Sequence, residues 1–135
     1  MYKFILFMIE KVLVLGASEK TNRYSYKAII KLKEYGHKVY ALGKNTGEVS
    51  GVNISTKFPN EQIDTVTIYL SPKNQQHYYS QLLEMAPQRI IFNPGAENGE
   101  FFKIAQNQNI NVLNACTLVM LSIGNFCINL LYLRP

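Results

Sequence analysis

Short runs of apolar residues alternate with amphipathic segments along this chain. Residues 12–15 are apolar at every position, which is typical of a parallel strand buried on both faces. The next segment carries apolar residues three and four positions apart, at Ala28, Ile29, Leu32 and Tyr35, before a glycine at position 36. This spacing predicts a helix over residues 25–35 that ends at the glycine.

The same alternation continues to residue 113. The segment DTVTIYL is rich in β-branched residues and is followed by Ser71 and Pro72, which are suited to the N-cap and first position of a helix. Residues 45–60 carry no clear period beyond a short strand-like segment at 52–54. We therefore expect strands over residues 12–15, 39–42, 64–70, 89–92 and 110–113, and helices over residues 25–35, 73–85 and 100–107.

Five strands separated by helices predict an α/β protein with a Rossmann-like, three-layer α/β/α architecture. The expected sheet has five strands, is mainly parallel and belongs to a single domain, which suits a chain of 135 residues. We place this domain at residues 10–126, after an N-terminal extension of residues 1–9 and before an apolar C-terminal tail of residues 127–135. Met8 is an alternative start, and the tail is too short to span a bilayer.

Composition narrows the class of partner. The formal net charge is +5, but the basic residues are scattered, so we expect neither a nucleic-acid nor a membrane partner. Cys116 and Cys127 form no paired motif, and the two histidines, His37 and His77, are not clustered with them. The sequence therefore predicts no metal site and no disulfide framework, and a cytoplasmic protein. The apolar ends leave a homodimer open.

The first strand-to-helix turn, within VLVLGASEKTNRYSYKAI, is suited to an anion because helix N-termini present unpaired N–H groups and a positive dipole end. It is not a dinucleotide fingerprint, since Ser18 and Thr21 stand where the second and third glycines would be. Lys44 follows the second strand in place of the acidic residue that holds a ribose hydroxyl. A phosphorylated ribose fits this lysine better.

Four segments together carry a resemblance: VLGASEKTNRYSYKAI, HKVYALGKNTGEVSGV, DTVTIYLSPKNQQHYY and RIIFNPGAENGEFFKIAQNQNINVLNACTLVML. The chain resembles the small stand-alone CoA-binding domain proteins, which are similar to the CoA-binding domain of the succinyl-CoA ligase α-chain. The resemblance implies that a small-molecule nucleotide ligand, coenzyme A, lies across the strand ends. Asn22 stands where the family commonly has proline.

The residues that the resemblance assigns to the cofactor follow the five strands. The first turn would face the pyrophosphate, Lys44 would reach a phosphate of the adenosine ribose, and later turns would line the rest of the molecule. Cys116 is either a thiol close to that of CoA or a small buried hydrophobe. The cofactor-binding residues are expected to be Gly16, Ala17, Ser18, Arg23, Ser25, Gly43, Lys44, Ser71, Pro72, Asn74, Asn93, Pro94, Gly95 and Cys116.

Two classes of function follow. The first is a protein that binds CoA or acyl-CoA as a carrier, sensor or partner subunit, and it is favoured because the motifs contain no acid–base pair, metal cluster or activated nucleophile. No catalytic or metal-binding residue is therefore predicted. The second is an enzyme or enzyme subunit that uses NADP or another nucleotide, which the single glycine turn and Lys44 would permit.

Overall fold

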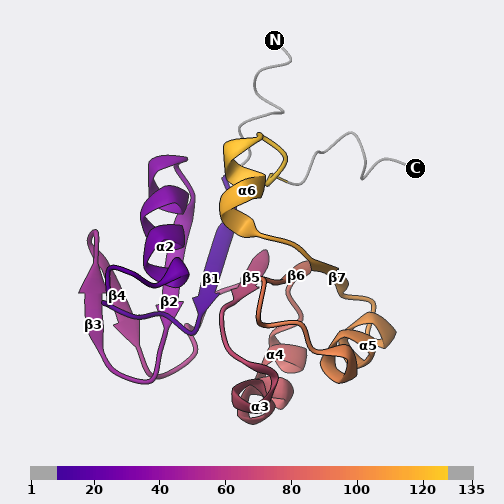
Figure 1. The fold of residues 1–135 in the computed structure, drawn as a ribbon. Helices are drawn as coiled ribbons and strands as arrows, with labels where there is room; N and C mark the ends of the chain where they lie inside the picture. The colour runs from indigo at the N-terminus through magenta and orange to yellow at the C-terminus, as the bar shows by residue number, and fades with distance from the viewer. Residues whose placement is uncertain (1–8, 128–135) are drawn as a thin grey trace.

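A computed structural model describes residues 9–127; residues 1–8, which include Met8, and 128–135 lie outside the described part. The described chain forms one α/β domain around a sheet of seven strands in the order β3-β4-β2-β1-β5-β6-β7 (Figure 1). All neighbouring strands are parallel except β3 and β4. The strands are β1 (Lys11–Leu15), β2 (Lys38–Leu42), β3 (Gly47–Val49), β4 (Val52–Ser55), β5 (Thr65–Ile68), β6 (Arg89–Phe92) and β7 (Asn111–Asn114).

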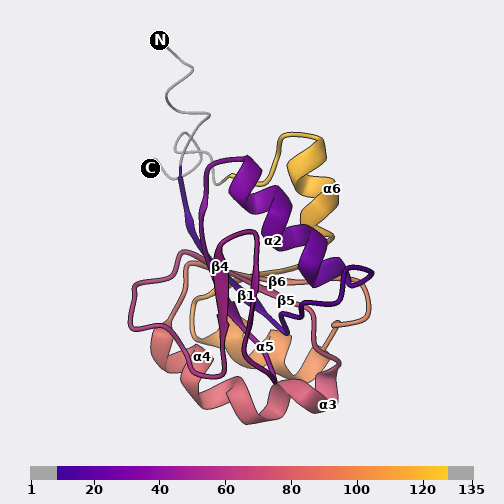
Figure 2. The same cartoon turned by 90° about the vertical axis from the view of Figure 1, so that its left-hand side faces the viewer.

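Helices cover both faces of the sheet, as the Rossmann-like prediction requires. In Figure 2, α2 and α6 lie on one side of the strands, and α3, α4 and α5 lie on the other. Alternate residues of β1 pack against the two helical layers. Val12 and Val14 pack under α2 and α6, whereas Leu13 and Leu15 pack toward α4 and α5. The helices are α2 (Tyr24–Glu34), α3 (Pro72–Gln75), η1 (Gln76–Tyr78, a 3-10 turn), α4 (Tyr79–Met85), α5 (Gly99–Asn107) and α6 (Thr117–Ser122).

Strand β1 lies at the point where the strand order reverses. It pairs with β2 over five residue pairs on one side and with β5 over four on the other. In open parallel sheets, ligands bind beyond the carboxyl ends of the strands at this point. The turns that follow β1, β2 and β5 are therefore the candidate ligand-binding positions.

The sheet has seven strands rather than the expected five. The additional strands, β3 and β4, form an antiparallel hairpin beyond β2, and β4 corresponds to the strand-like segment at residues 52–54. Ser50 and Gly51 form the hairpin turn with φ values of 51° and 81°. Two consecutive positive φ values are typical of a two-residue hairpin turn that matches the twist of the strands. The Ser-Gly pair was the signal for this hairpin in the sequence.

The helices also differ from the sequence-based expectation in two places. The single helix expected over residues 73–85 is divided by the 3-10 turn η1 into α3 and α4. Helix α6 follows β7 directly, and no helix was expected there. Ser71 is the N-cap of α3 with Pro72 in the first turn, as predicted, but its side chain makes no capping hydrogen bond.

A buried polar cluster joins the opposite, amino-terminal ends of the strands. The Arg89 guanidinium lies 3.3 Å from the Glu10 carboxylate, which also accepts a 2.6 Å hydrogen bond from the Thr65 hydroxyl. His37 Nδ1 accepts a hydrogen bond from the Glu10 backbone N–H at 3.1 Å. The Arg89 guanidinium and the His37 ring both contact the buried ring of Phe126. His37 is therefore part of this buried cluster.

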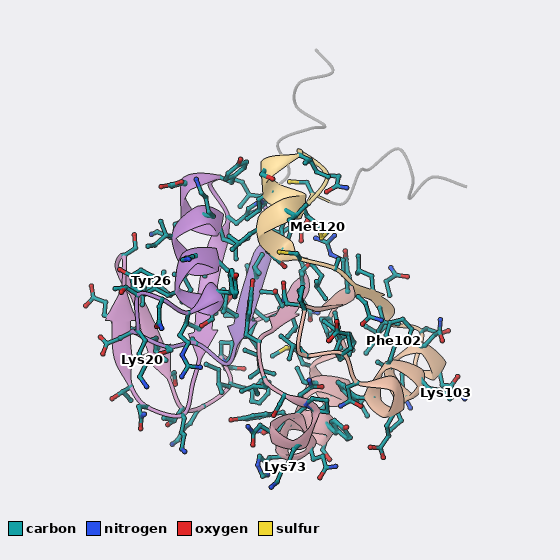
Figure 3. The ribbon with its side chains drawn as sticks, in the orientation of Figure 1. Lys20, Tyr26, Lys73, Phe102, Lys103 and Met120 are labelled. Carbon is teal, nitrogen blue, oxygen red and sulfur yellow. The ribbon has the colours of Figure 1, made fainter. Side chains whose placement is uncertain are left out.

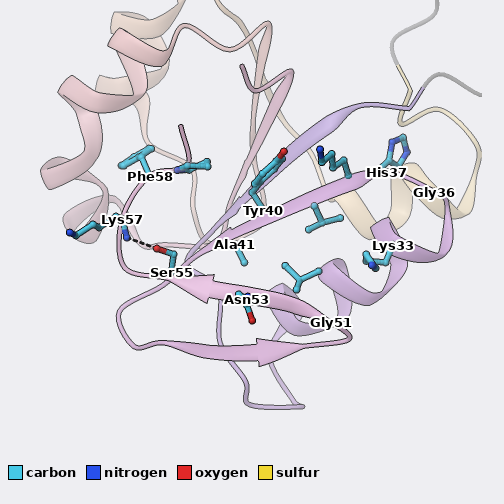
Figure 4. A pocket seen from close by; sticks show the side chains of 14 residues that line it. Lys33, Gly36, His37, Tyr40, Ala41, Gly51, Asn53, Ser55, Lys57 and Phe58 are labelled. Carbon is cyan, nitrogen blue, oxygen red and sulfur yellow. Dashed lines mark hydrogen bonds between the residues drawn. The ribbon is translucent and has the colours of Figure 1, made fainter. Parts of the chain in front are cut away.

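Strands β2 and β4 diverge toward their amino ends. Only Ala41 and Leu42 of β2 pair with β4, so a groove of about 530 Å³ opens between the two strands. Figure 4 shows Tyr40 and Phe58 toward one end of this groove and Lys33 and His37 toward the other. The hairpin is thus attached to the rest of the sheet through a short ladder. Separately, no helix within residues 9–127 is long and apolar enough to cross a membrane.

Candidate functional site

The turn after β1 is held against the end of β2. Gly16 adopts a φ of 95°, which favours glycine, and an added Cβ would lie 3.0 Å from the Leu70 side chain. The backbone N–H groups of Gly16 and Ala17 both donate to the Leu42 carbonyl, at 2.9 and 3.0 Å. These two donors are therefore used within the protein and are not available to a phosphate.

The turn after β2 lies directly against the turn after β1. Gly43 has no room for a side chain, because a Cβ there would lie 2.4 Å from the Ala17 carbonyl oxygen. Its N–H donates to the Ser55 carbonyl at 2.9 Å, which fixes the start of the turn. The two predicted glycine positions, Gly16 and Gly43, are thus brought together by close packing of the backbone.

Glu19 fastens the first turn to the hairpin. Its carboxylate accepts a 2.8 Å hydrogen bond from the Glu48 N–H and packs against Gly47. The only acidic side chain between β1 and α2 is therefore occupied at the start of β3. A negative charge next to an anion site would be unfavourable, and this contact holds the charge toward β3.

The first turn of α2 provides the donors that the preceding turn does not. Arg23 is the N-cap residue, no side chain forms a capping hydrogen bond, and the first turn contains no acidic residue. By contrast, the Asn98 side chain caps α5 by accepting from the Phe101 N–H at 3.0 Å. An uncapped helix of 11 residues with arginine at its start presents N–H groups, a dipole end and a guanidinium to an anion. Ser25 is buried in this same turn.

The lysine predicted to bind a ribose phosphate lies in the solvent at the end of β2. Lys44 is exposed, and Ser18, on the neighbouring turn, is half-buried and accepts from the Lys20 N–H at 3.1 Å. Lys20 belongs to the neighbouring turn after β1, whereas Lys73 and Lys103 extend from α3 and α5 in Figure 3. The basic residues thus do not form a single face.

The turn after β5 exposes the three residues that were predicted there, Ser71, Pro72 and Asn74. Behind them, the buried Gln75 amide donates 2.8 Å hydrogen bonds to the Leu70 and Ala96 carbonyls. This side chain joins the turn after β5 to the turn after β6. The Gln75 hydrogen bonds therefore hold in place the turn that carries the exposed residues.

Asn93, which follows β6, is buried and fully engaged. Its amide nitrogen donates to the Thr67 hydroxyl at 2.7 Å and to the Ile68 carbonyl at 3.0 Å, and its oxygen accepts from the Thr117 N–H at 2.9 Å. The side chain thus connects β5, β6 and α6. Pro94 and Gly95 are exposed, so at this turn a ligand would contact these two residues and not the buried Asn93 side chain.

Tyr69 lies beside the predicted turns, and the sequence prediction did not include it. It follows β5 directly, and its backbone lies against Gly16, where an added Cβ would be 3.2 Å from the Tyr69 carbonyl carbon. Its hydroxyl is buried close to Thr67, Thr117 and the half-buried, free thiol of Cys116. Burial of this hydroxyl raises the pKa of Tyr69 to about 12. In sequence, Tyr69 was counted only as a strand residue, and no local motif distinguishes it.

The predicted positions share one edge of the sheet. Because β1, β2, β5, β6 and β7 are parallel, the turns that follow them lie at the same edge. Within residues 9–127, no group of three His, Cys, Asp or Glu side chains is placed to hold a metal ion. The edge offers an uncapped helix start, an exposed lysine and backbone turns, which suits binding of an extended anionic molecule.

Comparison with known proteins agrees with this geometry. The CoA binding domain model of a protein family matches residues 10–122. A solved structure of an uncharacterized protein is 44% identical, with a TM-score of 0.85 over 88% of this chain and 99% of that one. A hypothetical protein from Pyrococcus horikoshii OT3 is 25% identical, with a TM-score of 0.75 over 84% of this chain and 82% of that one.

A larger protein contains the same fold as one part. The dinucleotide forming acetyl-coenzyme A synthetase 1 of Ca. Korarchaeum cryptofilum is 18% identical, with a TM-score of 0.66 over 80% of this chain and 26% of that one. A comparison with curated proteins gave no match. The family match spans most of the chain and coincides with the element order and the turns described above. The chain belongs to the CoA-binding domain family.

Proposed function

We propose that the protein binds coenzyme A or an acyl-CoA at the carboxyl edge of the sheet, and acts as a carrier, sensor or partner subunit. The observation that carries this proposal is the uncapped start of α2 with Arg23 at its N-cap, beside the point where the strand order reverses. Phosphate groups bind readily at such a helix start. The family match supports CoA as the source of the phosphates.

The positions of the site residues along the sheet edge define the orientation of the ligand in this proposal. The pyrophosphate lies at the first turn of α2, near Arg23, and the adenosine ribose phosphate lies toward Lys44 at the end of β2. The pantetheine arm then runs the other way, past Ser71 and Asn74 toward Cys116. In this arrangement the protein binds and orients the ligand, and no described side chain pair is assigned an acid–base role.

Calorimetric titration tests the proposal and its alternative together. Wild-type protein is titrated with CoA, dephospho-CoA, NADP, NAD and ATP, and we expect CoA to bind most tightly. Dephospho-CoA lacks the ribose phosphate, so it should bind about tenfold more weakly if that phosphate contacts Lys44. Tighter binding of NADP than of CoA would favour the nucleotide-dependent enzyme instead.

Two lysine variants make the assignment specific. Lys44→Ala should lower the affinity for CoA to that for dephospho-CoA and leave the affinity for dephospho-CoA unchanged. Lys103→Ala, which removes an exposed lysine on α5, serves as the matched control and should change neither. Equal affinity of wild-type protein for CoA and dephospho-CoA would contradict the role of Lys44, and no binding of CoA would contradict the function.

A further inference from the structure

The groove between β2 and β4 is separate from the residues assigned to CoA. None of the residues that line it is among the predicted cofactor-binding positions. Its volume of about 530 Å³ falls within the range of ligand-binding clefts. A strand forms each side of it, and the loop after β4 contributes to one end (Figure 4). The proposed function leaves this groove without a role.

One backbone position of β2 faces the groove without a strand partner. The Lys38 N–H donates to the Glu10 carbonyl, on the side of β1, at 3.0 Å. Successive residues of a strand direct their backbone groups to opposite neighbours, so the N–H and C=O of Val39 point toward β4. However, β4 pairs with β2 only at Ala41 and Leu42. The backbone of β2 therefore presents an open edge at Val39, and extended peptides pair readily with such edges.

The charged side chains of the groove are lysines. Lys33 of α2, Lys38 of β2 and Lys57 after β4 are exposed, and no ion pair among the described residues includes them. Glu61 interacts with Lys38, but its carboxylate pairs with Lys11 at 3.1 Å. The lining itself contains no aspartate or glutamate. The groove is thus complementary in charge to an acidic ligand.

Two half-buried aromatic rings add an apolar part to the groove. Tyr40 belongs to β2 and Phe58 to the loop after β4. Phe58 is held by an edge-to-face contact with Tyr78, with 5.7 Å between the ring centroids. Figure 4 shows Lys57 beside Phe58 at one end of the groove and Lys33 toward the other end. The groove therefore combines apolar contacts with cations at both ends.

We propose that the β2–β4 groove binds an extended, acidic peptide segment of a partner protein. The peptide backbone pairs with Val39, its carboxylates contact the three lysines, and its apolar side chains contact the two rings. Residues 37–41 of β2 extend over about 13 Å, which matches four or five residues of an extended peptide. A single-stranded nucleic acid fits less well, because it has no peptide groups to pair with Val39 and needs a longer basic track. This second site does not depend on CoA binding.

Fluorescence polarisation with synthetic peptides tests the proposal. The probe is a fluorescein-labelled peptide of alternating glutamate and valine, and the comparison peptide has lysine in place of glutamate. We expect wild-type protein to bind the acidic peptide about tenfold more tightly than the basic one, since like charges repel. Methylation of the two central backbone nitrogens of the acidic peptide should weaken its binding about three- to tenfold, because strand pairing is blocked.

A pair of charge-matched variants locates the contact. Lys33→Glu combined with Lys57→Glu should weaken binding of the acidic peptide about tenfold and strengthen binding of the basic one. Lys73→Glu combined with Lys103→Glu makes the same change in net charge at exposed positions on α3 and α5, and should alter neither affinity. Equal weakening in both variants would assign the binding to net charge and overturn the inference. The N-methylated peptide tests the pairing on wild-type protein, without any variant.

The remaining outcomes separate this inference from the proposed function. If the acidic peptide does not bind wild-type protein, or if the N-methylated peptide binds equally well, the inference is wrong. Tighter binding of a uridine oligonucleotide than of the acidic peptide would indicate a nucleic-acid partner and also overturn it. Saturating CoA should leave the peptide affinity unchanged, whereas displacement of the peptide by CoA would make the groove part of the CoA site. Peptide binding by a protein that does not bind CoA would contradict only the proposed function.

Discussion

Gly43 is the residue at which the backbone of the site leaves least space. A Cβ at this position would lie 2.4 Å from the Ala17 carbonyl oxygen, so Gly43→Ala must push the turn after β1 away from the end of β2. We expect a loss of about 1–3 kcal/mol in the free energy of unfolding, which is typical of overpacked positions. Chemical denaturation of the ligand-free protein measures it.

Gly99→Ala is the control for this substitution. Gly99 lies in the first turn of α5, and an added Cβ would meet nothing within 4 Å. Replacing glycine by alanine at a compatible position stabilises proteins by about 0.4–1 kcal/mol, so the two substitutions should have opposite signs. A destabilisation of similar size at both positions would contradict the close approach at Gly43.

His37 should make the stability depend on pH. Burial lowers the pKa of His37 below its ordinary value of 6.5, although the nearby Glu10 carboxylate opposes the shift and Arg89 adds to it. The unfolded chain therefore binds a proton at this residue more readily than the folded protein does. Stability should be full above pH 6.5 and should fall as the pH drops from 6.5 toward the lowered pKa.

Denaturation curves between pH 7.5 and 5.5 test this dependence. His37→Gln should show a shallower loss of stability over this range than the wild type, because the protonation that favours unfolding is removed. His77 is exposed, so His77→Gln should keep the wild-type slope. A wild-type slope in His37→Gln would assign the pH dependence to other groups.

At the scale of elements, the start of α2 has no side-chain cap, and we propose that it binds the phosphates of CoA. Arg23→Asp places a good capping residue where no side chain caps the helix now, so the ligand-free protein should gain about 0.5–2 kcal/mol. The same change replaces a cation with an anion at the proposed phosphate site, so the affinity for CoA should fall more than tenfold. Thermal unfolding and calorimetry measure the two effects.

The opposite signs of these effects are the critical feature of the Arg23 prediction. Asn98→Ala removes the side-chain cap of α5 together with the hydrogen bonds from the Asn98 amide to Gln75 and Tyr79, so it should lower stability by more than the about 1 kcal/mol of a cap alone, and it leaves the charge at the start of α2 unchanged. If Arg23→Asp bound CoA as tightly as the wild type, the start of α2 would not be the phosphate site.

The elements also show how much of the fold can be predicted from the sequence. Periodicity located the strands β1, β2, β5, β6 and β7 within a few residues, because buried parallel strands are continuously apolar and helices have a different period. It missed β3, a three-residue edge strand that is only partly buried and has no pattern of its own. Such strands form because a neighbour and a turn hold them, as Ser50 and Gly51 do here.

The candidate site was predictable in position and less so in detail. The parallel pairing of the strands places every predicted turn at one edge of the sheet, the edge beyond which ligands of such sheets bind. The sequence did not show that the Leu42 carbonyl takes the N–H groups of Gly16 and Ala17, nor that Tyr69 brings a hydroxyl without a partner to this edge. Both facts depend on contacts between segments distant in the chain.

At the scale of the whole molecule, the sheet is held unevenly from centre to edge. Strand β1 pairs along its whole length with β2 and over four residues with β5, whereas β2 and β4 share only two pairs beside the open groove. Amides in β1 and β5 should therefore exchange with solvent only through global unfolding. Amides of the β3–β4 hairpin should exchange faster, through local opening.

Bound CoA should separate these two kinds of exchange. A ligand that binds only the folded protein raises the free energy of global unfolding by about 2.7 kcal/mol at a concentration 100 times its Kd. Hydrogen exchange followed by mass spectrometry should then show amides of β1 and β5 slowed by about 100-fold, and the hairpin slowed much less, since its opening leaves the start of α2 in place. Equal slowing in both regions would mean that the hairpin and the site open together, and a hairpin as slow as β1 without ligand would mean that the short β2–β4 ladder is not a weak point of the sheet.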